Sequence, residues 1–282
     1  MKLMRLGAHG VEKPALLHSD GTRRDLTEFV SDISGPTLTP EGLKKLAAID
    51  ATSLPIIDPA TRIGSCVGSA GKFICVGLNY SDHAEEAGLK VPPEPILFMK
   101  ATSAICGPND KIIIPRNSTK TDWEVELGLV IGKGGAYIDE AEALDHVAGY
   151  CVINDISERA FQTERSGQWV KGKSADTFGP IGPYLLTADD VPDPQNLRLW
   201  LEVDGHRYQN GTTSTMVYGV QFLVHYISQF MSLQPGDIIS TGTPPGVGMG
   251  VKPNPVYLKP GQQMRLGIDG LGEQIQTTIA AK

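Results

Sequence analysis

The sequence predicts an α+β fold that is rich in β-structure, and three observations lead to this expectation. The chain of 282 residues contains 32 glycines and 20 prolines without a repeating period, which indicates many turns. Its apolar segments are short and are bounded by polar or turn residues, as strands are. Hydrophobic residues make up 40% of the chain and charged residues 20%, which is ordinary for a globular protein with a true core.

The chain is expected to divide into a small N-terminal α+β domain, residues 1–66, and a larger domain, residues 67–282. In the first part, Ser19-Asp20-Gly21 separates two short apolar runs and suits a hairpin. Thr39 is a candidate N-cap for a short helix with Pro40 in its first turn. This part holds no cluster of chemical groups, so we assign it to packing, to dimer contact or to the edge of a site.

The elements of the larger part follow from local patterns, taken in chain order. β-Branched or apolar runs that end at turn residues are expected to be strands, and apolar stripes at helical spacing are expected to be helices. Strands are expected at 72–77, 96–100, 111–115, 121–132, 149–157, 199–203, 207–209, 238–241, 264–268 and 274–279, and helices at 81–88, 140–147 and 217–231.

Three acidic residues on two of these strands predict a metal site. Glu124 and Glu126 alternate along the strand 121–132 and therefore share one face. Two like charges on one face repel unless water or a cation neutralises them, so a solvated strand face is the plain alternative. Asp155 follows the apolar run of a second strand and adds a third carboxylate. Because Mg²⁺ and Mn²⁺ prefer such all-oxygen ligands, the leading hypothesis is a divalent metal site.

A second candidate group is His83 with Glu86. The two residues are three positions apart in the helix 81–88 and share its face. A carboxylate beside an imidazole orients the ring and raises its basicity, as a general base requires. Taken alone, the pair is better explained as a surface pair. It is not the zinc-protease motif, because the second histidine of that motif is missing.

The segment 167–174 matches the phosphate-binding pattern Gly-x-x-x-x-Gly-Lys-Ser, but we reject nucleotide binding there. Such a loop needs an apolar strand before it and a helix after it. Here polar residues precede the segment, and a stretch rich in glycine and proline follows it.

Charge and cysteine content bound the environment and the partners. A net charge of -7 argues weakly against nucleic acid or an anionic membrane as partner. The 4 cysteines form no Cys-x-x-Cys pair and have apolar neighbours, so we expect buried, reduced thiols. We find no targeting segment at the N-terminus and no uncharged apolar run long enough to cross a bilayer. A cytoplasmic protein is therefore expected.

Six segments in one order resemble the fumarylacetoacetate hydrolase family. No single segment is specific, but their order is, and the resemblance spans roughly residues 70–270. The small N-terminal part also resembles that of a bacterial branch known as ureidoglycolate lyases or as hydrolases of 2,4-diketo-3-deoxy-L-fuconate or L-rhamnonate. The segments are Val76–Tyr80 with His83 and Glu86, Phe98–Lys100, Asp122–Leu127, Gly149–Arg159, Gly172–Ser174 with Phe178–Pro180, and Thr241–Pro244.

This resemblance implies a rolled, mixed β-sheet catalytic domain, usually in a homodimer, and roles for particular residues. The larger eukaryotic members have a further aspartate ligand before the histidine, for which 77–80 offers no clear counterpart, and Asp82 is not assigned that role. The resemblance implies that Glu124, Glu126 and Asp155 hold Mg²⁺ or Mn²⁺, that His83 with Glu86 activates water, that Lys173 supports the reacting oxygen, and that Tyr80, Lys100, Arg159, Gln162 and Thr243 line the substrate pocket.

The expected activity is hydrolysis of the C3–C4 bond of a 2,4-dioxo acid, such as a 2,4-diketo-3-deoxy sugar acid, to pyruvate and a carboxylic acid. The acid end of such a small-molecule substrate chelates a divalent ion. Ureidoglycolate lyase is the alternative, since the same metal would chelate its α-hydroxy acid. Hydrolysis is favoured because it uses every group named above. Oxaloacetate decarboxylation, dienoate isomerisation and a non-catalytic metal-binding protein stay open.

Overall fold

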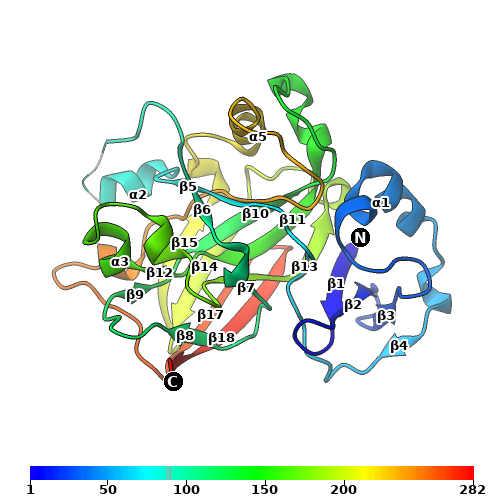
Figure 1. Cartoon of the computed structure of the whole chain (residues 1–282), viewed down its shortest axis with the longest axis horizontal. Coiled ribbons are helices and arrows are strands. Elements are labelled where there is room, and N and C mark those ends of the chain that lie inside the picture. The colour runs from blue at the N-terminus through cyan, green and yellow to red at the C-terminus, as the bar shows by residue number, and fades with distance from the viewer. Residues whose placement is uncertain (87, 89) are drawn as a thin grey trace.

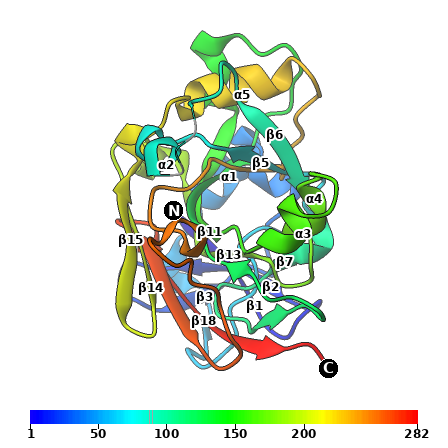
Figure 2. The same cartoon turned by 90° about the vertical axis from the view of Figure 1, so that its left-hand side faces the viewer.

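The computed structural model describes residues 1–86, 88 and 90–282, and within these it leaves out the side chains of residues 83 and 84. Two β-sheets dominate this part of the chain, with short helices and loops around them (Figures 1 and 2). The larger sheet has 11 strands and the smaller one has 5. The prediction of an α+β fold rich in β-structure is therefore confirmed.

The larger sheet is mixed, and its central strands carry the candidate site. Its order is β4-β3-β2-β1-β13-β11-β10-β16-β5-β6, with β7 paired to β13. The pairs β16–β5 and β13–β7 are parallel, and the other pairs are antiparallel. Its strands are β1 (Lys2–Leu6), β2 (Lys13–Leu17), β3 (Arg23–Asp25), β4 (Ile56–Ile57), β5 (Phe73–Gly77), β6 (Ile96–Lys100), β7 (Ile105–Cys106), β10 (Val125–Ile131), β11 (Val147–Asn154), β13 (Gly179–Thr187) and β16 (Ile238–Ser240).

The smaller sheet packs on the larger one and encloses the main core between them. Its order is β15-β14-β17-β18-β8, and β8 joins β18 in parallel. Leu127 and Val152 of the larger sheet share one apolar cluster with Leu201 and Leu266 of the smaller sheet. Its strands are β8 (Ile112–Ile114), β14 (Arg198–Val203), β15 (His206–Thr212), β17 (Gln263–Ile268) and β18 (Gly272–Ala280), and a separate pair joins β9 (Thr121–Asp122) to β12 (Ser157–Glu158).

The helices are short and lie at the ends and faces of the sheets (Figures 1 and 2). The predicted cap of the first helix is confirmed, because the Thr39 hydroxyl accepts a hydrogen bond of 3.1 Å from the Gly42 amide. The α-helices are α1 (Pro40–Ala47), α2 (Ser81–Glu86), α3 (Arg159–Thr163), α4 (Val170–Lys173) and α5 (Val220–Ser228), and 3₁₀ turns occupy Gly35–Leu38, Ala51–Ser53, Thr102–Ala104, Glu140–His146, Ala188–Asp190, Thr213–Thr215 and Gly248–Gly250.

Three predicted elements differ in the structure, and one is the strand predicted at 149–157, which is broken between β11 and β12. The helix predicted at 140–147 is a 3₁₀ helix, in which the buried residues Ala143 and His146 lie three positions apart and share one face. The strand predicted at 121–132 is broken between β9 and β10. There the amide of Trp123 donates to the Asp122 carboxylate, and the amide of Glu124 donates to the Asn154 side chain. Side chains thus replace the backbone ladder where the first metal-ligand candidate lies.

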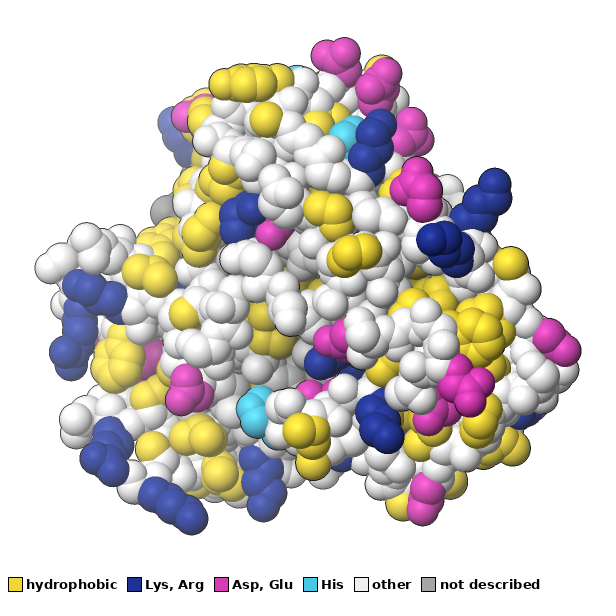
Figure 3. Space-filling view, turned by 45° about the vertical axis from the view of Figure 1, so that its right-hand side comes forward, with side chains coloured by type: hydrophobic (Ala, Val, Ile, Leu, Met, Phe, Trp, Pro, Cys, Tyr) yellow, Lys and Arg dark blue, Asp and Glu magenta, His cyan; other side chains and the backbone are white. Residues whose placement is uncertain are grey.

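The N-terminal strands continue the larger sheet rather than forming a sheet of their own. β1 pairs antiparallel with β13 through Leu3 and Leu185, and the predicted hairpin is present as β2 and β3. On the face of the molecule that includes this side, acidic, basic and apolar side chains are interspersed (Figure 3). The division at residues 66 and 67 stays a prediction.

Among the described residues, no helix has both the length and the apolarity that crossing a membrane requires. All four cysteines are buried and free of disulfides, as predicted.

Candidate metal centre and active site

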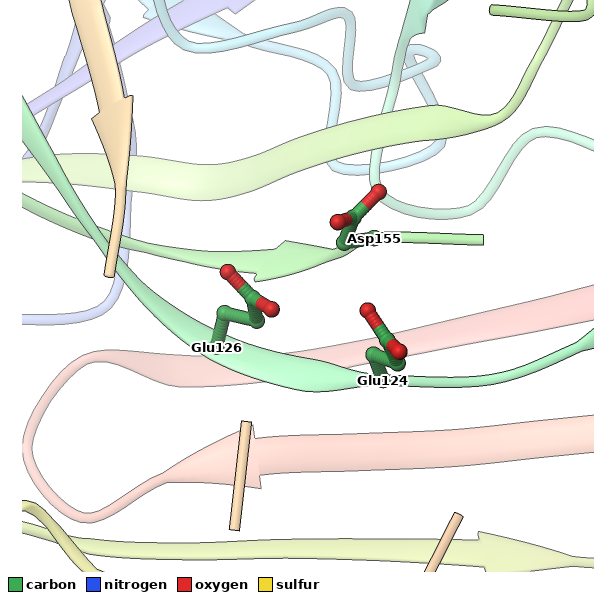
Figure 4. Close-up of side chains that lie close together, drawn as sticks. All are labelled: Glu124, Glu126 and Asp155. Carbon is green, nitrogen blue, oxygen red and sulfur yellow. The ribbon is translucent and has the colours of Figure 1, made fainter. Parts of the chain in front are cut away.

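Three buried carboxylates converge at the start of β10 and the end of β11 (Figure 4). Glu124 lies one residue before β10, Glu126 lies within it, and Asp155 directly follows β11. The Asp155 amide donates to the Glu124 carbonyl at 2.9 Å, which ties the two strand ends together. One ligand atom from each residue lies within 4.8 Å of the others. The sheet register therefore brings together the three acids that the sequence predicted as ligands.

Glu124 is held by two cations. Nη2 of Arg159 donates to one carboxylate oxygen at 2.6 Å, and Nζ of Lys173 donates to the other at 2.7 Å. Burial alone would raise the pKa of Glu124, but Arg159 and Lys173 together hold it below its usual value. Glu124 is therefore ionised in the folded protein.

Asp155 lies between two lysines. Lys173 donates to one oxygen at 2.6 Å, and the buried ammonium of Lys100 donates to the other and also to the Ile156 carbonyl at 2.9 Å. Burial alone would lower the pKa of Lys173, but the Asp155 and Glu124 carboxylates raise it above its usual value. Lys173 therefore bridges two of the three acids, and both acids favour its charged form.

Glu126 differs because its hydrogen bonds come from neutral donors. The Ser240 hydroxyl donates to it at 2.5 Å and the Gly242 amide at 2.9 Å. Burial, followed by repulsion from Asp155 and Glu124, raises the pKa of Glu126 well above its usual value. Of the three acids, this carboxylate most needs a further positive charge.

The charges of the cluster fit a divalent cation. Arg159 also donates to Asp122 through Nε at 2.9 Å, so Asp122 belongs to the same network. When all groups are ionised, four carboxylates face Arg159, Lys173 and Lys100, and one negative charge remains. The donor set is all oxygen, which hard ions such as Mg²⁺ and Mn²⁺ prefer.

The helix α2 meets the loop that follows β16 through Glu86. The Gly246 amide points at both oxygens of this carboxylate, at 3.1 and 3.2 Å. A Cβ atom on Gly250 would lie 2.8 Å from Oε2 of Glu86, so a larger residue there would displace this carboxylate. The side chain of His83 lies outside the described residues, and its pairing with Glu86 stays a prediction.

A cavity of about 370 Å³ is lined by Glu124 and Glu126 but not by Asp155, and some of the predicted substrate contacts also line it. Glu124, Glu126 and Lys173 form its polar end, and its wall also includes Glu86, Arg159, Gln162 and Thr243. Tyr80 and Lys100 do not line this cavity; the buried Tyr80 hydroxyl has no hydrogen-bond partner in the described part of the chain. The substrate-binding roles of all five residues stay predictions.

Several residues at the site were not assigned from the sequence. Asp122 anchors Arg159, and Ser240 holds Glu126, although both are ordinary strand residues in their local patterns. Trp169 and Met249 line the cavity. Trp169 belongs to the segment that resembles a phosphate-binding loop, which the structure places between α3 and β13 rather than between a strand and a helix. One local sign in the sequence indicates that Trp169 has a role at the site, which is its aromatic side chain within the rejected phosphate-loop match.

The chain belongs to the fumarylacetoacetate hydrolase family. The family domain described as fumarylacetoacetate (FAA) hydrolase C-terminal matches residues 72–279. A Burkholderia multivorans protein, named provisionally as a hydrolase, is 64% identical over 282 residues and covers 100% of both chains. The chain is thus similar over its whole length to a protein that is named, provisionally, as a hydrolase.

Solved structures extend the likeness to named enzymes. The fumarylacetoacetate hydrolase of Exiguobacterium antarcticum is 33% identical with a TM-score of 0.86, and the maleylpyruvate hydrolase of Sphingobium sp. SYK-6 is 28% identical with a TM-score of 0.83. A 5-carboxymethyl-2-hydroxymuconate delta-isomerase of Mycobacterium smegmatis is 30% identical with a TM-score of 0.79. Each comparison covers 100% of both chains.

Proposed function

We propose that this protein is a divalent-metal-dependent hydrolase that cleaves the C3–C4 bond of a 2,4-dioxo acid to pyruvate and a carboxylic acid. The observation that carries the proposal is the unbalanced carboxylate cluster at the polar end of the cavity. The relatives support it through their names, because fumarylacetoacetate hydrolase and maleylpyruvate hydrolase are hydrolases of oxo acids. A divalent cation would change the net charge of the site from negative to positive, and the site would then attract an anionic substrate.

A divalent ion held by Glu124, Glu126 and Asp155 would supply a Lewis acid that binds the acid end of the substrate and stabilises the pyruvate enolate. In the proposed reaction His83, oriented by Glu86, takes a proton from water, which attacks the carbonyl carbon C4. The C4 oxygen becomes negatively charged, and the ammonium of Lys173 is the nearby cation proposed to stabilise it. The C3–C4 bond then breaks with its electron pair on C3, and a proton returns to C3 to give pyruvate.

Pyruvate release tests the proposal directly. The purified protein is mixed with acylpyruvates and with 2,4-diketo-3-deoxy sugar acids, with Mg²⁺ and with a chelator, while diketo absorbance and pyruvate are followed. We expect metal-dependent loss of absorbance with one pyruvate formed per substrate. Turnover of ureidoglycolate to glyoxylate and urea, with every diketo acid untouched, would replace this proposal with the C–N lyase.

The assignment of the base is tested by His83→Ala. Its turnover is expected to fall by about 10²- to 10⁴-fold, because that is the usual contribution of a positioned general base. Binding of Mn²⁺ should persist, since the carboxylate ligands lie on β10 and β11. The variant His206→Ala, which changes an exposed histidine at the start of β15, is the matched control and should keep normal turnover. Near-normal turnover of His83→Ala with metal bound would show that another group activates water.

Isomerisation is a second candidate, because a structural neighbour that matches over 100% of both chains is named as an isomerase. It needs the same metal-bound oxo acid but moves a proton without adding water. An absorbance shift of a 2-hydroxydienoate without pyruvate formation would favour it.

A further inference from the structure

Asp122 is a buried carboxylate beside the site, and it belongs neither to the three candidate ligands nor to the cavity lining. Its Oδ1 accepts a hydrogen bond from the Gly248 amide at 2.7 Å, besides the bond from the amide of the residue that follows it. Its Oδ2 accepts from the Met249 amide at 3.0 Å and from Nε of Arg159 at 2.9 Å. One carboxylate at the end of β9 therefore joins the start of α3 to residues 246–250, which we call the cavity loop.

Arg159 is buried and divides its nitrogens between three partners, of which Asp122 is one. Nη2 donates to the ligand candidate Glu124 at 2.6 Å, and Nη1 donates to Oε1 of Gln162 at 3.0 Å. A guanidinium group is planar and rigid, so its N–H groups point in fixed directions relative to one another. The acceptor that holds Nε therefore sets where the other two nitrogens point.

The bond from Arg159 also determines which end of the Gln162 side chain is left for a ligand. Arginine only donates hydrogen bonds, so the amide oxygen of Gln162 must face it. The amide nitrogen Nε2 has no hydrogen-bond partner among the described residues, although Gln162 lines the cavity. This nitrogen is thus a donor available to an acceptor atom of a bound molecule, as long as Arg159 keeps its orientation.

We propose that Asp122 is a positioning residue for metal and substrate binding. Through Arg159 it orients Glu124 and the amide of Gln162, and through two backbone amides it holds the cavity loop beside them. The inference rests on the proposed function for the ion and the substrate, and it adds a residue that lies outside the ligand set and the cavity lining. Loss of the Asp122 carboxylate should therefore weaken metal binding and loosen the cavity loop together.

Asp122→Ala removes all four acceptor bonds and tests the effect on the metal ligand. Calorimetry is expected to give a Mn²⁺ affinity about tenfold lower than that of the wild type, the low end for a group that orients a ligand. Asp237→Ala is the matched control, because Asp237 is also buried, accepts from two backbone amides and pairs with Lys72, yet does not line the cavity. It should lower stability and leave Mn²⁺ affinity unchanged. Wild-type affinity in Asp122→Ala would overturn the inference.

Hydrogen exchange tests the hold on the cavity loop without metal or turnover. The amides of Gly248 and Met249 are expected to exchange at least about tenfold faster in Asp122→Ala, because the carboxylate that accepts from them is gone. Asp237→Ala should leave the exchange of these two amides unchanged. Wild-type exchange of both amides in Asp122→Ala would overturn the inference.

Asp122→Asn gives the same readouts if the alanine variant does not fold. It keeps the size of the side chain, but its single oxygen can accept from only one of the two pairs of donors. Either the Mn²⁺ affinity must fall or the exchange of the cavity loop must become faster. A folded Asp122→Asn protein that shows neither change would overturn the inference.

A double-mutant cycle shows whether Asp122 acts through Arg159. Arg159→Lys keeps the positive charge but loses the rigid fork of donors, so Mn²⁺ affinity should also fall. The protein with both Asp122→Ala and Arg159→Lys should bind Mn²⁺ at least about threefold more tightly than the two separate losses together predict. Losses that simply multiply would contradict the inference, because the two residues would then act independently.

Turnover separates this inference from the proposed function. With saturating Mg²⁺ and 2,4-dioxohexanoate as substrate, Asp122→Ala is expected to raise KM by about three- to tenfold and to lower kcat less, because the proposed base is untouched. A loss of kcat with a wild-type KM would overturn the inference and leave the C–C hydrolase in place. If the wild type releases no pyruvate from any 2,4-dioxo acid, the proposed function fails, and Mn²⁺ affinity and hydrogen exchange still decide the role of Asp122.

Discussion

Two clusters of carboxylates in this protein differ in whether every acid contacts a cation. In the first, Arg62 donates to Glu12 at 2.9 Å and to Asp110 at 2.8 Å, and thereby links the N-terminal strands to the larger part of the chain. Burial would raise the pKa of both acids, yet Arg62 lowers each of them. In the second, no described side chain gives Glu126 such a cation, and the pKa of Glu126 is raised. Every acid of the first cluster, the paired cluster, contacts an arginine, whereas one acid of the second contacts no cation among the residues that the structure describes and marks a place for an added cation.

The largest expected effect is on Mn²⁺ affinity, which should fall when an acid of the second cluster is changed but not when an acid of the first is changed. Glu126→Gln should lower Mn²⁺ affinity by about 100-fold or more, because a ligand is lost. Its stability without metal should hold or increase, since a buried repulsion is removed. Glu12→Gln is the matched control and should lower stability with Mn²⁺ affinity unchanged. Calorimetric titration and thermal unfolding provide both readouts, and wild-type affinity in Glu126→Gln would remove Glu126 from the ligand set.

Breaking the paired cluster should cost stability rather than metal affinity. Arg62→Met leaves two partly buried carboxylates without their cation, and we expect the free energy of unfolding to fall by about 2–4 kcal/mol. Urea unfolding measures this change. Arg207→Met, which breaks an exposed pair with Glu202, should cost less than about 1 kcal/mol. Similar losses in the two variants would show that the Arg62 cluster has no special structural role.

A smaller effect is expected when one neutral donor to Glu126 is removed. Ser240→Ala deletes the hydroxyl that donates at 2.5 Å but keeps the Gly242 amide. Mn²⁺ affinity should fall by about tenfold, at the low end for a group that orients a ligand. Ser228→Ala, a buried serine bonded to the Ile138 amide and the His225 carbonyl, is the control. Equal affinities for both variants would mean that Ser240 does not position Glu126.

The smallest effect is a pH dependence of the paired cluster. Glu12 and Asp110 have pKa values below those of the unfolded chain, so they stabilise the fold above about pH 4. That stabilisation is lost as the pH falls through their folded pKa values. The gap in unfolding free energy between wild type and Arg62→Met should therefore narrow below about pH 4. Urea unfolding from neutral to acidic pH measures the gap, which would stay constant if the pKa values were normal.

Local patterns in the sequence were sufficient for the fold class, the hairpin β2–β3 and the cap at Thr39. Alternation along one strand was also sufficient to select Glu124 and Glu126, which the structure places beside Asp155. These features depend on residues that are close in sequence or on a donor set whose chemistry is distinctive. These features could be predicted because few backbone conformations or ligand sets are compatible with such local sequence patterns.

Long-range partners could not be predicted in the same way. Nothing in the pattern around Lys100 indicates that its ammonium pairs with Asp155, 55 residues away. The same is true of Trp169, whose contact with Phe98 depends on how α4 packs against β6. The 3₁₀ geometry of Glu140–His146 was also missed, since buried positions three apart suit both helix types. Such features follow from tertiary packing, which local propensity does not specify.

The pairing of β1 with β13 has a consequence for aggregation. β13 is a long strand whose residues Leu185 and Leu186 pair with Leu3 and Lys2 of β1. Without the first strand, this stretch of β13 would become an open edge with unpaired amides and carbonyls beside apolar side chains, which is a template for intermolecular strand addition. The N-terminal strands thus cover an edge of the central sheet and prevent other chains from pairing with it. A chain shortened by this segment should self-associate even though every residue of the carboxylate cluster is retained.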